Sequence, residues 1–240
     1  EFGEEYRPAM RLAAEWLVDT QDPDGAWRRY ASPFDSPGEK AYDTHVALGL
    51  FEVARIEGVQ RYANSGLANV RWALKHQREN GWFDNCCLTD PSKPLTHALG
   101  YALRGIFEAY RFTQDPTLLS ASLRTARGLF SGLRDDGFLP GRFNSSWKGT
   151  VKWSCLTGSM QVAICWMLLY QYTGETWCLD AAISANRFVR RTMRNCATPE
   201  IRGAIKGAYP IYGDYCAHQF PNWAAKFFID SNMLEKQITH

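Results

Sequence analysis

The sequence predicts an all-α fold, an α/α toroid of about four helical hairpins in an incomplete or open ring. Two observations predict it. Apolar residues recur with a helical period along almost the whole chain, and no segment alternates as a strand would. A glycine followed by an aromatic or small residue also recurs at Gly25, Gly81 and Gly137, at a constant interval of 56 residues. A fixed interval in this range indicates stacked copies of one supersecondary unit.

Each copy of the repeat places its glycine just after an amphipathic helix. A glutamine precedes the glycine in two copies, as Gln21 before Gly25 and Gln77 before Gly81. A glutamine amide at a helix end bonds backbone groups, and a neighbouring aromatic ring packs over the next turn. We therefore interpret four repeat residues as structural links between helices: Gln21, Trp27, Gln77 and Trp82.

The eight predicted helices form pairs along the chain. The first helix of each pair carries charge on one face, and these helices cover residues 5–20, 59–76, 116–133 and 175–195. The second helix is rich in small and apolar residues, and these helices cover residues 40–57, 94–113, 152–172 and 218–236. A helix that is small or apolar on all sides is buried on most sides, so the second helices form the inner ring.

Prolines and glycines mark the boundaries of these helices. Pro94, Pro116 and Pro221 each lie in a predicted first turn, where the missing N–H of proline costs little. Gly58 and Gly174 follow predicted helix ends, where a left-handed residue is favourable.

Length and composition limit the remaining possibilities. The 240 residues are 45% hydrophobic, enough for a single α/α-toroid domain over 1–240, either complete in itself or part of a longer chain. A net charge of +2 gives no sign of a nucleic-acid partner. The most apolar stretch, 156–170, is shorter than a membrane span. Seven cysteines, an odd number with Cys165 inside an apolar helix, favour a reduced, cytoplasmic protein.

The order of Trp16-Leu17, Gln21 and Gly25-Ala26-Trp27, repeated at Trp72, Gln77 and Gly81-Trp82, resembles the QW repeats of squalene and terpenoid cyclases. Related α/α toroids include protein prenyltransferase β subunits, lanthionine-forming cyclases, polysaccharide lyases and six-hairpin glycosidases. The resemblance covers roughly residues 10–140 and implies the architecture, because this fold supports unrelated reactions. The Asp-x-Asp-Asp motif of triterpene cyclases is absent, which argues against that activity.

In such toroids, functional residues gather where the inner helices begin. Asp43, His45 and His97 are expected there, and we predict them to be catalytic. An Asp beside a His suits general acid–base chemistry, because the carboxylate holds the imidazole in one tautomer and orientation. The Thr-His pairs at 44–45 and 96–97 also follow the repeat, so a purely structural role is an equal alternative.

Aromatic and polar residues near the same helix ends suit a saccharide. Aromatic rings bind the CH faces of sugars, and scattered polar groups bind the hydroxyls. The predicted substrate-binding residues are Tyr42, Tyr101, Trp153, Gln161, Lys206, Tyr212, Tyr215, Asn222, Trp223 and Lys226. We therefore expect a carbohydrate-active enzyme resembling polysaccharide lyases or six-hairpin glycosidases, without a cofactor. Hydrolysis requires a second carboxylate beside Asp43, for which Asp84 and Asp214 are candidates.

Two alternatives belong to other classes. Asp214-Tyr215-Cys216 resembles the Asp-x-Cys zinc ligands of prenyltransferase β subunits, and His218 completes a possible site, so a zinc-dependent transferase or cyclase is the first. The second is a non-catalytic sugar-binding or scaffold module, which binds saccharides through its aromatic residues and does not turn them over.

Overall fold

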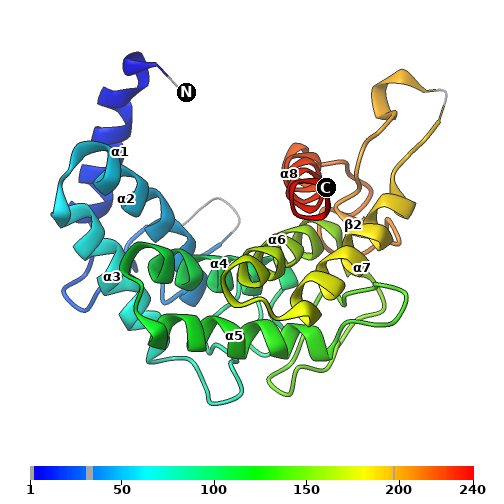
Figure 1. Cartoon of the computed structure of the whole chain (residues 1–240), viewed down its shortest axis with the longest axis horizontal. Helices are drawn as coiled ribbons and strands as arrows, with labels where there is room; N and C mark the ends of the chain where they lie inside the picture. Colours follow the sequence, from blue (N-terminus) through cyan, green and yellow to red (C-terminus); the bar gives the residue numbers. More distant parts are fainter. Residues whose placement is uncertain (1–2, 31–34, 197) are drawn as a thin grey trace.

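The computed structural model describes residues 3–30, 35–196 and 198–240, and this part of the chain contains eight α-helices (Figure 1). They are α1 (Arg7–Asp19), α2 (Thr44–Glu57), α3 (Gln60–Leu74), α4 (Thr96–Thr113), α5 (Pro116–Ser131), α6 (Leu156–Thr173), α7 (Thr176–Thr192) and α8 (Asn222–Thr239). Short 3-10 helices occupy Glu4–Tyr6, Ala41–Asp43 and Pro199–Ile201. Every predicted helix therefore has a counterpart.

Two details of the prediction are wrong. The inner helices begin two to four residues later than expected, because the residues before them, such as Leu95 and Cys155, are extended. The described residues also contain one small antiparallel ladder, β1 (Ser154–Cys155) with β2 (Ala208–Tyr209). Strands of two residues are too short to show alternation in a sequence.

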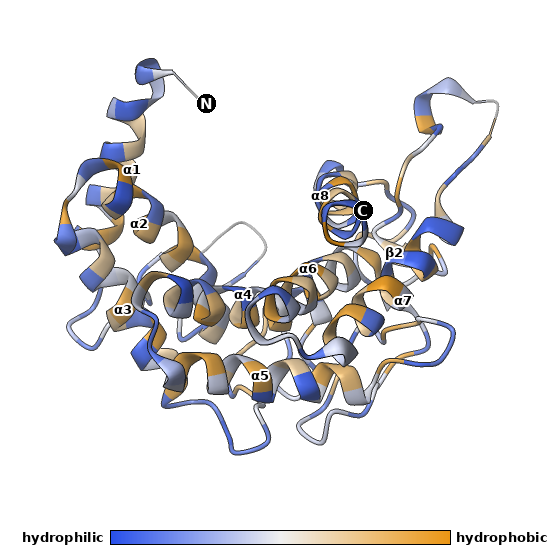
Figure 2. Ribbon diagram, viewed as in Figure 1, coloured by the Kyte–Doolittle hydropathy of each residue, from blue (hydrophilic) through white to orange (hydrophobic). Residues whose placement is uncertain are grey.

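The second helices of the pairs form one continuous row. α2 packs against α4, α4 against α6, and α6 against α8, while α3, α5 and α7 pack against this row. Figure 1 shows the helices following an arc from α1 to α8, and Figure 2 shows hydrophilic and hydrophobic segments alternating along α5 and α7, as in amphipathic helices. Thirteen of the eighteen residues of α6 are buried, which makes it the most enclosed helix of the row. The number of hairpins and the closure of the ring stay predictions.

Glycines allow the inner helices to approach closely. A Cβ on Gly105 of α4 would lie 2.1 Å from the carbonyl oxygen of Thr44, and one on Gly158 of α6 would lie 2.6 Å from the amide nitrogen of His97. Side chains at these positions would force the helices apart. The small residues seen in the sequence thus bring the first turns of the inner helices together.

The repeated glycines have a structural role, as predicted. Gly25, Gly81 and Gly137 have φ values of 100°, 82° and 83°, which favour glycine over any residue with a Cβ. A Cβ at Gly25 would lie 2.5 Å from the carbonyl oxygen of Ala68, so the turn touches the backbone of α3. The other two glycines make the same approach to α5 and α7.

The repeated glutamines bond the glycine turn or the helix beside it, and the tryptophans bond or pack against neighbouring segments, with Trp82 buried against Trp147; these contacts agree with their interpretation as links. Gln21 Nε2 donates to the carbonyl oxygens of Gly25 (2.9 Å) and Ser65 (3.0 Å). Gln77 Nε2 donates to the carbonyl oxygen of Ala121 (2.9 Å). Trp27 Nε1 donates to the carbonyl oxygen of Leu17 (2.8 Å).

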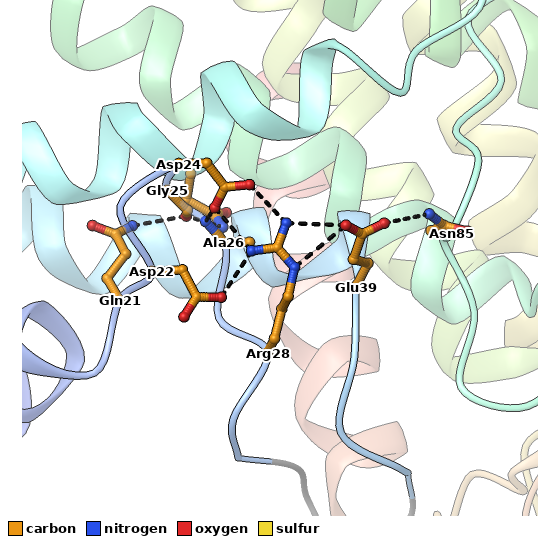
Figure 3. Close-up of polar contacts among 9 residues, drawn as sticks. Gln21, Asp22, Asp24, Gly25, Ala26, Arg28, Glu39 and Asn85 are labelled. Atoms are coloured by element: carbon orange, nitrogen blue, oxygen red, sulfur yellow. Dashed lines mark hydrogen bonds and ion pairs between the residues drawn. The ribbon is translucent and has the colours of Figure 1, made fainter.

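Arg28 fixes the segment that follows the first turn. Figure 3 shows its guanidinium among Asp22 (2.8 Å), Asp24 (2.7 Å) and Glu39 (3.0 Å). Glu39 also accepts from Asn85 Nδ2 (3.0 Å), so the cluster joins the connection between α1 and α2 to the connection between α3 and α4. The residues after Glu39 lead directly into the start of α2, so the cluster helps to hold that helix end in place.

The cysteines and the apolar helices bear on the predicted location of the protein. All seven cysteines are free thiols. Within the described residues, no helix is long and apolar enough to span a membrane. A cytoplasmic location stays a prediction.

Candidate functional site

The inner helices begin with four side chains at equivalent positions. The second residue is His45 in α2, His97 in α4, Thr157 in α6 and Trp223 in α8. Because the glycine contacts bring these turns together, residues far apart in the sequence meet at one end of the helix row. The site described below, called the histidine site, consists of His45, His97, Tyr101, Thr157, Gln161, Tyr215 and Trp223.

His97 is held by Gln161 across the contact between α4 and α6. Its Nδ1–H donates to Gln161 Oε1 at 2.9 Å, because an amide oxygen only accepts. The other ring nitrogen, Nε2, therefore carries a lone pair. Burial lowers the pKa of His97 to about 4, and the bond to Gln161 opposes this only in part. His97 is thus a neutral imidazole at physiological pH.

Tyr101 lies between the two histidines. Its ring stacks on His45 with 4.1 Å between centroids and contacts His97 at 4.4 Å. The pKa of His45 is lowered to about 4 by burial, then by the positive charges of Arg104 and Lys226 and by His97. Burial also raises the pKa of Tyr101. All three groups are uncharged near neutral pH.

Three buried polar atoms at this site make no hydrogen bond of standard geometry to the described residues: His45 Nδ1, Thr157 Oγ1 and Gln161 Nε2. The Tyr215 hydroxyl lies close enough to Thr157, and the Tyr101 hydroxyl to Gln161, for each contact to affect the pKa of the tyrosine, whereas His45 has no such neighbour among the described residues. The three atoms come from α2 and α6: His45 stacks on Tyr101, which contacts His97, and Gln161 is the hydrogen-bond partner of His97. The Gln161 side chain is almost fully enclosed, at 4% exposure. Buried polar atoms in folded proteins are normally satisfied, so unpaired ones at one place indicate a site for a hydrogen-bonding ligand.

An aromatic ring from the last part of the chain packs against His97, and a second ring bonds to the first. Tyr215 contacts His97 at 5.4 Å between ring centroids, and its hydroxyl accepts from Trp223 Nε1 at 3.0 Å. Burial raises the pKa of Tyr215 well above its usual value. Lys226, one turn after Asn222, is exposed and paired with Asp230 at 2.6 Å.

Asp43 is not paired with either histidine, contrary to the predicted arrangement. Residues two apart in a helical turn point in nearly opposite directions, so Asp43 and His45 diverge. His45 Nδ1 is unpaired, and the group that orients His97 is the Gln161 amide. Asp43 instead lines a separate pocket beside α1. Burial, followed by the negative charge of Asp35, raises its pKa to about 7.

Four other residues that the sequence predicts to bind substrate make contacts outside the histidine site. Tyr42 donates to Asp35, which also pairs with Lys40 at 2.9 Å. The Trp153 ring is only 9% exposed because it packs where Gly141 and Gly213 lack a Cβ. Lys206 donates to the carbonyl oxygen of Thr192 at 2.9 Å, and Tyr212 is 68% exposed. None of these four is part of the histidine site.

The alternative zinc ligands do not converge. Asp214 pairs with Arg142 at 3.1 Å, and both Cys216 and His218 have positive φ values, 49° and 60°. In the part of the chain that the structure describes, no three His, Cys, Asp or Glu side chains are grouped as metal ligands would be.

Three residues near these sites were not predicted as ligand contacts: Thr157, Trp16 and Tyr30. Thr157 occupies the position in α6 that His45 and His97 occupy in their helices, so the repeat itself carried that signal. A larger depression between α3 and α5 involves Gln77 and Arg124, which bond to each other at 2.6 Å and belong to the structural repeat.

Several solved structures resemble the fold. The unsaturated glucuronyl hydrolase of Bacillus sp. GL1, responsible for degradation of glycosaminoglycan, superposes with a TM-score of 0.79 at 16% identity, over 99% of this chain and 70% of that one. An unsaturated glucuronyl hydrolase specific for heparin gives 0.79 at 11% identity, over 98% and 70%. An α-1,6-mannanase of Salegentibacter sp. HEL1_6, in complex with α-1,6-mannotriose, gives 0.70 at 14% identity, over 96% and 65%.

These neighbours are α/α toroids of the six-hairpin glycosidase type, which confirms the predicted fold class. At such identities the likeness concerns the fold alone. The expected link to terpenoid cyclases has no support among them. No protein-family model matches the chain, and no curated protein matches its sequence.

Proposed function

We propose that the chain is a carbohydrate-active enzyme domain that binds a saccharide at the histidine site, with His97 as the general base. The observation that carries this proposal is the group of buried polar atoms on His45, Thr157 and Gln161 that lack a hydrogen bond of standard geometry. A sugar hydroxyl both donates and accepts, so neighbouring hydroxyls of one ring can satisfy a lone pair and an N–H together.

The state of His97 supports its role as a base. The Gln161 oxygen keeps the proton on Nδ1, which leaves Nε2 free to take a proton. The low pKa keeps nearly all of the protein in this form at neutral pH. Histidine is the side chain that most often acts as a general base, although a pKa of about 4 makes His97 a weaker base than a free imidazole.

The rings around His97 support a saccharide as the substrate. Tyr101 and Tyr215 contact the imidazole from two sides, and Trp223 adds a 40% exposed indole beside them. Ligand sites of this type combine aromatic walls with a few placed polar groups. The structural neighbours agree with this substrate class, since one is responsible for the degradation of glycosaminoglycan and another is an α-1,6-mannanase.

The reaction class depends on which groups share the site. Glycoside hydrolysis uses two carboxyl groups on either side of the bond. The histidine site as defined contains no carboxyl group, and Asp43 lies in another pocket. Removal of a ring proton by His97, as in a polysaccharide lyase, therefore suits the histidine site better than hydrolysis.

The test is turnover of a panel of uronate-containing polysaccharides and α-mannans by the protein. Elimination produces a carbon–carbon double bond that absorbs in the ultraviolet, whereas hydrolysis produces reducing ends without that absorbance. We expect His97→Ala to lower turnover by about 10²-fold or more, as for loss of a general base, while the exposed His218→Ala remains active. Undiminished turnover in His97→Ala contradicts the assignment, and saccharide binding without turnover indicates a non-catalytic module.

A further inference from the structure

A second pocket lies on the other side of the start of α2 from His45. It is formed by the end of α1, the turn after it and the first residues of α2. Trp16, Trp27, Tyr30, Arg29 and Asp43 are the lining residues that matter here. Neither the resemblance to QW-repeat proteins nor the packing of the helices assigns a role to this pocket.

Two half-exposed aromatic rings form one wall of the pocket. Trp16 is 50% exposed and Tyr30 is 49% exposed, with 5.2 Å between their ring centroids and 45° between their planes. The Arg29 guanidinium lies over the Tyr30 ring, 5.2 Å from its centroid. The pair therefore offers adjoining apolar faces at an angle, open to solvent.

The repeat does not explain why Trp16 is exposed. Trp72 is the equivalent residue one repeat later, and it is 3% exposed with Arg28 over its ring at 5.7 Å. The indole of Trp27 links two segments of the fold, because its Nε1 donates a hydrogen bond to the carbonyl oxygen of Leu17. Trp16 is thus the tryptophan of this region whose ring is available to a ligand.

Asp43 supplies the polar group of the pocket. Asp43 lines the pocket together with Val46, one turn into α2. Its carboxyl group feels the charges of Asp35 and Lys40, and no side-chain hydrogen bond or close ion pair of Asp43 is found among the described residues. A half-buried carboxyl group without a protein partner can accept a hydrogen bond from a ligand hydroxyl. Aromatic faces beside a lone acceptor are the combination that a sugar ring requires, since one side of the ring is apolar and its edge carries hydroxyls.

We propose that this pocket is a saccharide subsite, in which a pyranose ring packs on Trp16 and Tyr30 and donates a hydroxyl hydrogen bond to Asp43. The inference rests on the proposed function, because the ring belongs to the same saccharide chain that the histidine site binds. The first turn of α2 separates the two sites, with His45 facing one and Asp43 the other. The subsite therefore sets the preference for longer chains and does not take part in the chemistry.

The experiment begins with a glycan microarray of neutral and uronate-containing oligosaccharides, probed with the wild-type protein. The longest and the shortest bound members of one series are then titrated by calorimetry. We expect Trp16→Ala and Asp43→Asn each to weaken binding of the longest member by about tenfold, or about 1.4 kcal/mol. Binding of the shortest member should change less than twofold. Leu12→Ala, an exposed apolar residue of α1 outside the pocket, is the matched control.

The outcomes separate the two proposals. If the longest member binds Trp16→Ala and Asp43→Asn as tightly as wild type, while His97→Ala weakens it, the subsite is wrong and the proposed function stands. If wild type binds no glycan on the array, both are wrong. Circular dichroism and thermal melting of each variant establish that any loss of binding occurs in folded protein.

Discussion

The imidazole of His97 and the amide of Gln161 meet between α4 and α6, with 2.9 Å from Nδ1 to Oε1. Gly158, one turn before Gln161, makes this distance possible because a Cβ there would press on the backbone of Thr96 and His97. Helix packing thus sets the tautomer of the imidazole. Because the Gln161 amide carries no charge, burial remains the dominant influence on the pKa of His97.

A carboxylate in place of the amide should reverse that balance. In Gln161→Glu, a negative charge beside Nδ1 favours the protonated imidazole, and we expect the pKa of His97 to rise by roughly one to three units. The measurement is an NMR titration of the ring, with His218 as an exposed reference. Gln161→Met, which has no charge and no acceptor, should leave the pKa at about 4 or below. An unchanged pKa in Gln161→Glu would mean that the amide does not contact Nδ1 in solution.

The stability of the protein should depend on Asp43 in a defined pH range. The folded pKa of about 7 lies above the ordinary aspartate value of 3.8, so Asp43 favours the folded state below about pH 4. This contribution is lost as pH rises through 7, because the carboxyl group must then ionise where it is poorly hydrated. Asp43→Asn does not ionise and should melt a few degrees higher than wild type at pH 8. The difference should vanish near pH 4, and a constant difference across this range would show that Asp43 titrates normally.

The glycines of the repeat should tolerate substitution far less than other left-handed glycines. A Cβ at Gly81 would lie 2.4 Å from the carbonyl carbon of Arg124, whereas one at Gly174 meets nothing within 4 Å. Both have positive φ, 82° and 71°, so Gly174→Ala incurs only the conformational cost of roughly 1–2 kcal/mol. Gly81→Ala adds displacement of α5 and should be at least about twice as destabilising in urea unfolding. Equal losses would show that the turn does not touch α5.

The fold was predictable from the sequence because its signals are local and repeated. Helical periodicity and the interval between Gly25, Gly81 and Gly137 depend on neighbouring residues, and each copy repeats the information. The sequence predicts that the inner helices start a few residues earlier than they do. Leu95 and Cys155 are apolar and continue the helical pattern, yet their backbone is extended.

The site was only partly predictable, because its pairs cross between helices. The sequence identified His45, His97, Tyr101, Gln161, Tyr215 and Trp223 as neighbours at the inner helix starts, and the structure brings them together. It assigned Asp43 as the partner of a histidine by proximity in the chain, where the helical turn in fact separates them. The bond between His97 and Gln161 spans 64 residues and has no counterpart in the spacing of the repeat.

Two glycines of the inner row should respond to alanine in opposite directions. Gly49 is exposed on α2 and a Cβ there would meet nothing within 4 Å, so Gly49→Ala should stabilise the protein by about 0.5–1 kcal/mol through helix propensity. Gly105 is also helical, yet a Cβ there would lie 2.1 Å from the Thr44 carbonyl oxygen. Gly105→Ala should therefore lower the free energy of unfolding by about 1–3 kcal/mol, as overpacking does, despite the same gain in propensity. The added Cβ in Gly105→Ala would also displace the first turn of α2, in which His45 stacks on Tyr101 of α4. Saccharide binding should therefore weaken in Gly105→Ala and stay unchanged in Gly49→Ala. Equal effects of the two substitutions in urea unfolding would show that α2 and α4 do not make this close contact.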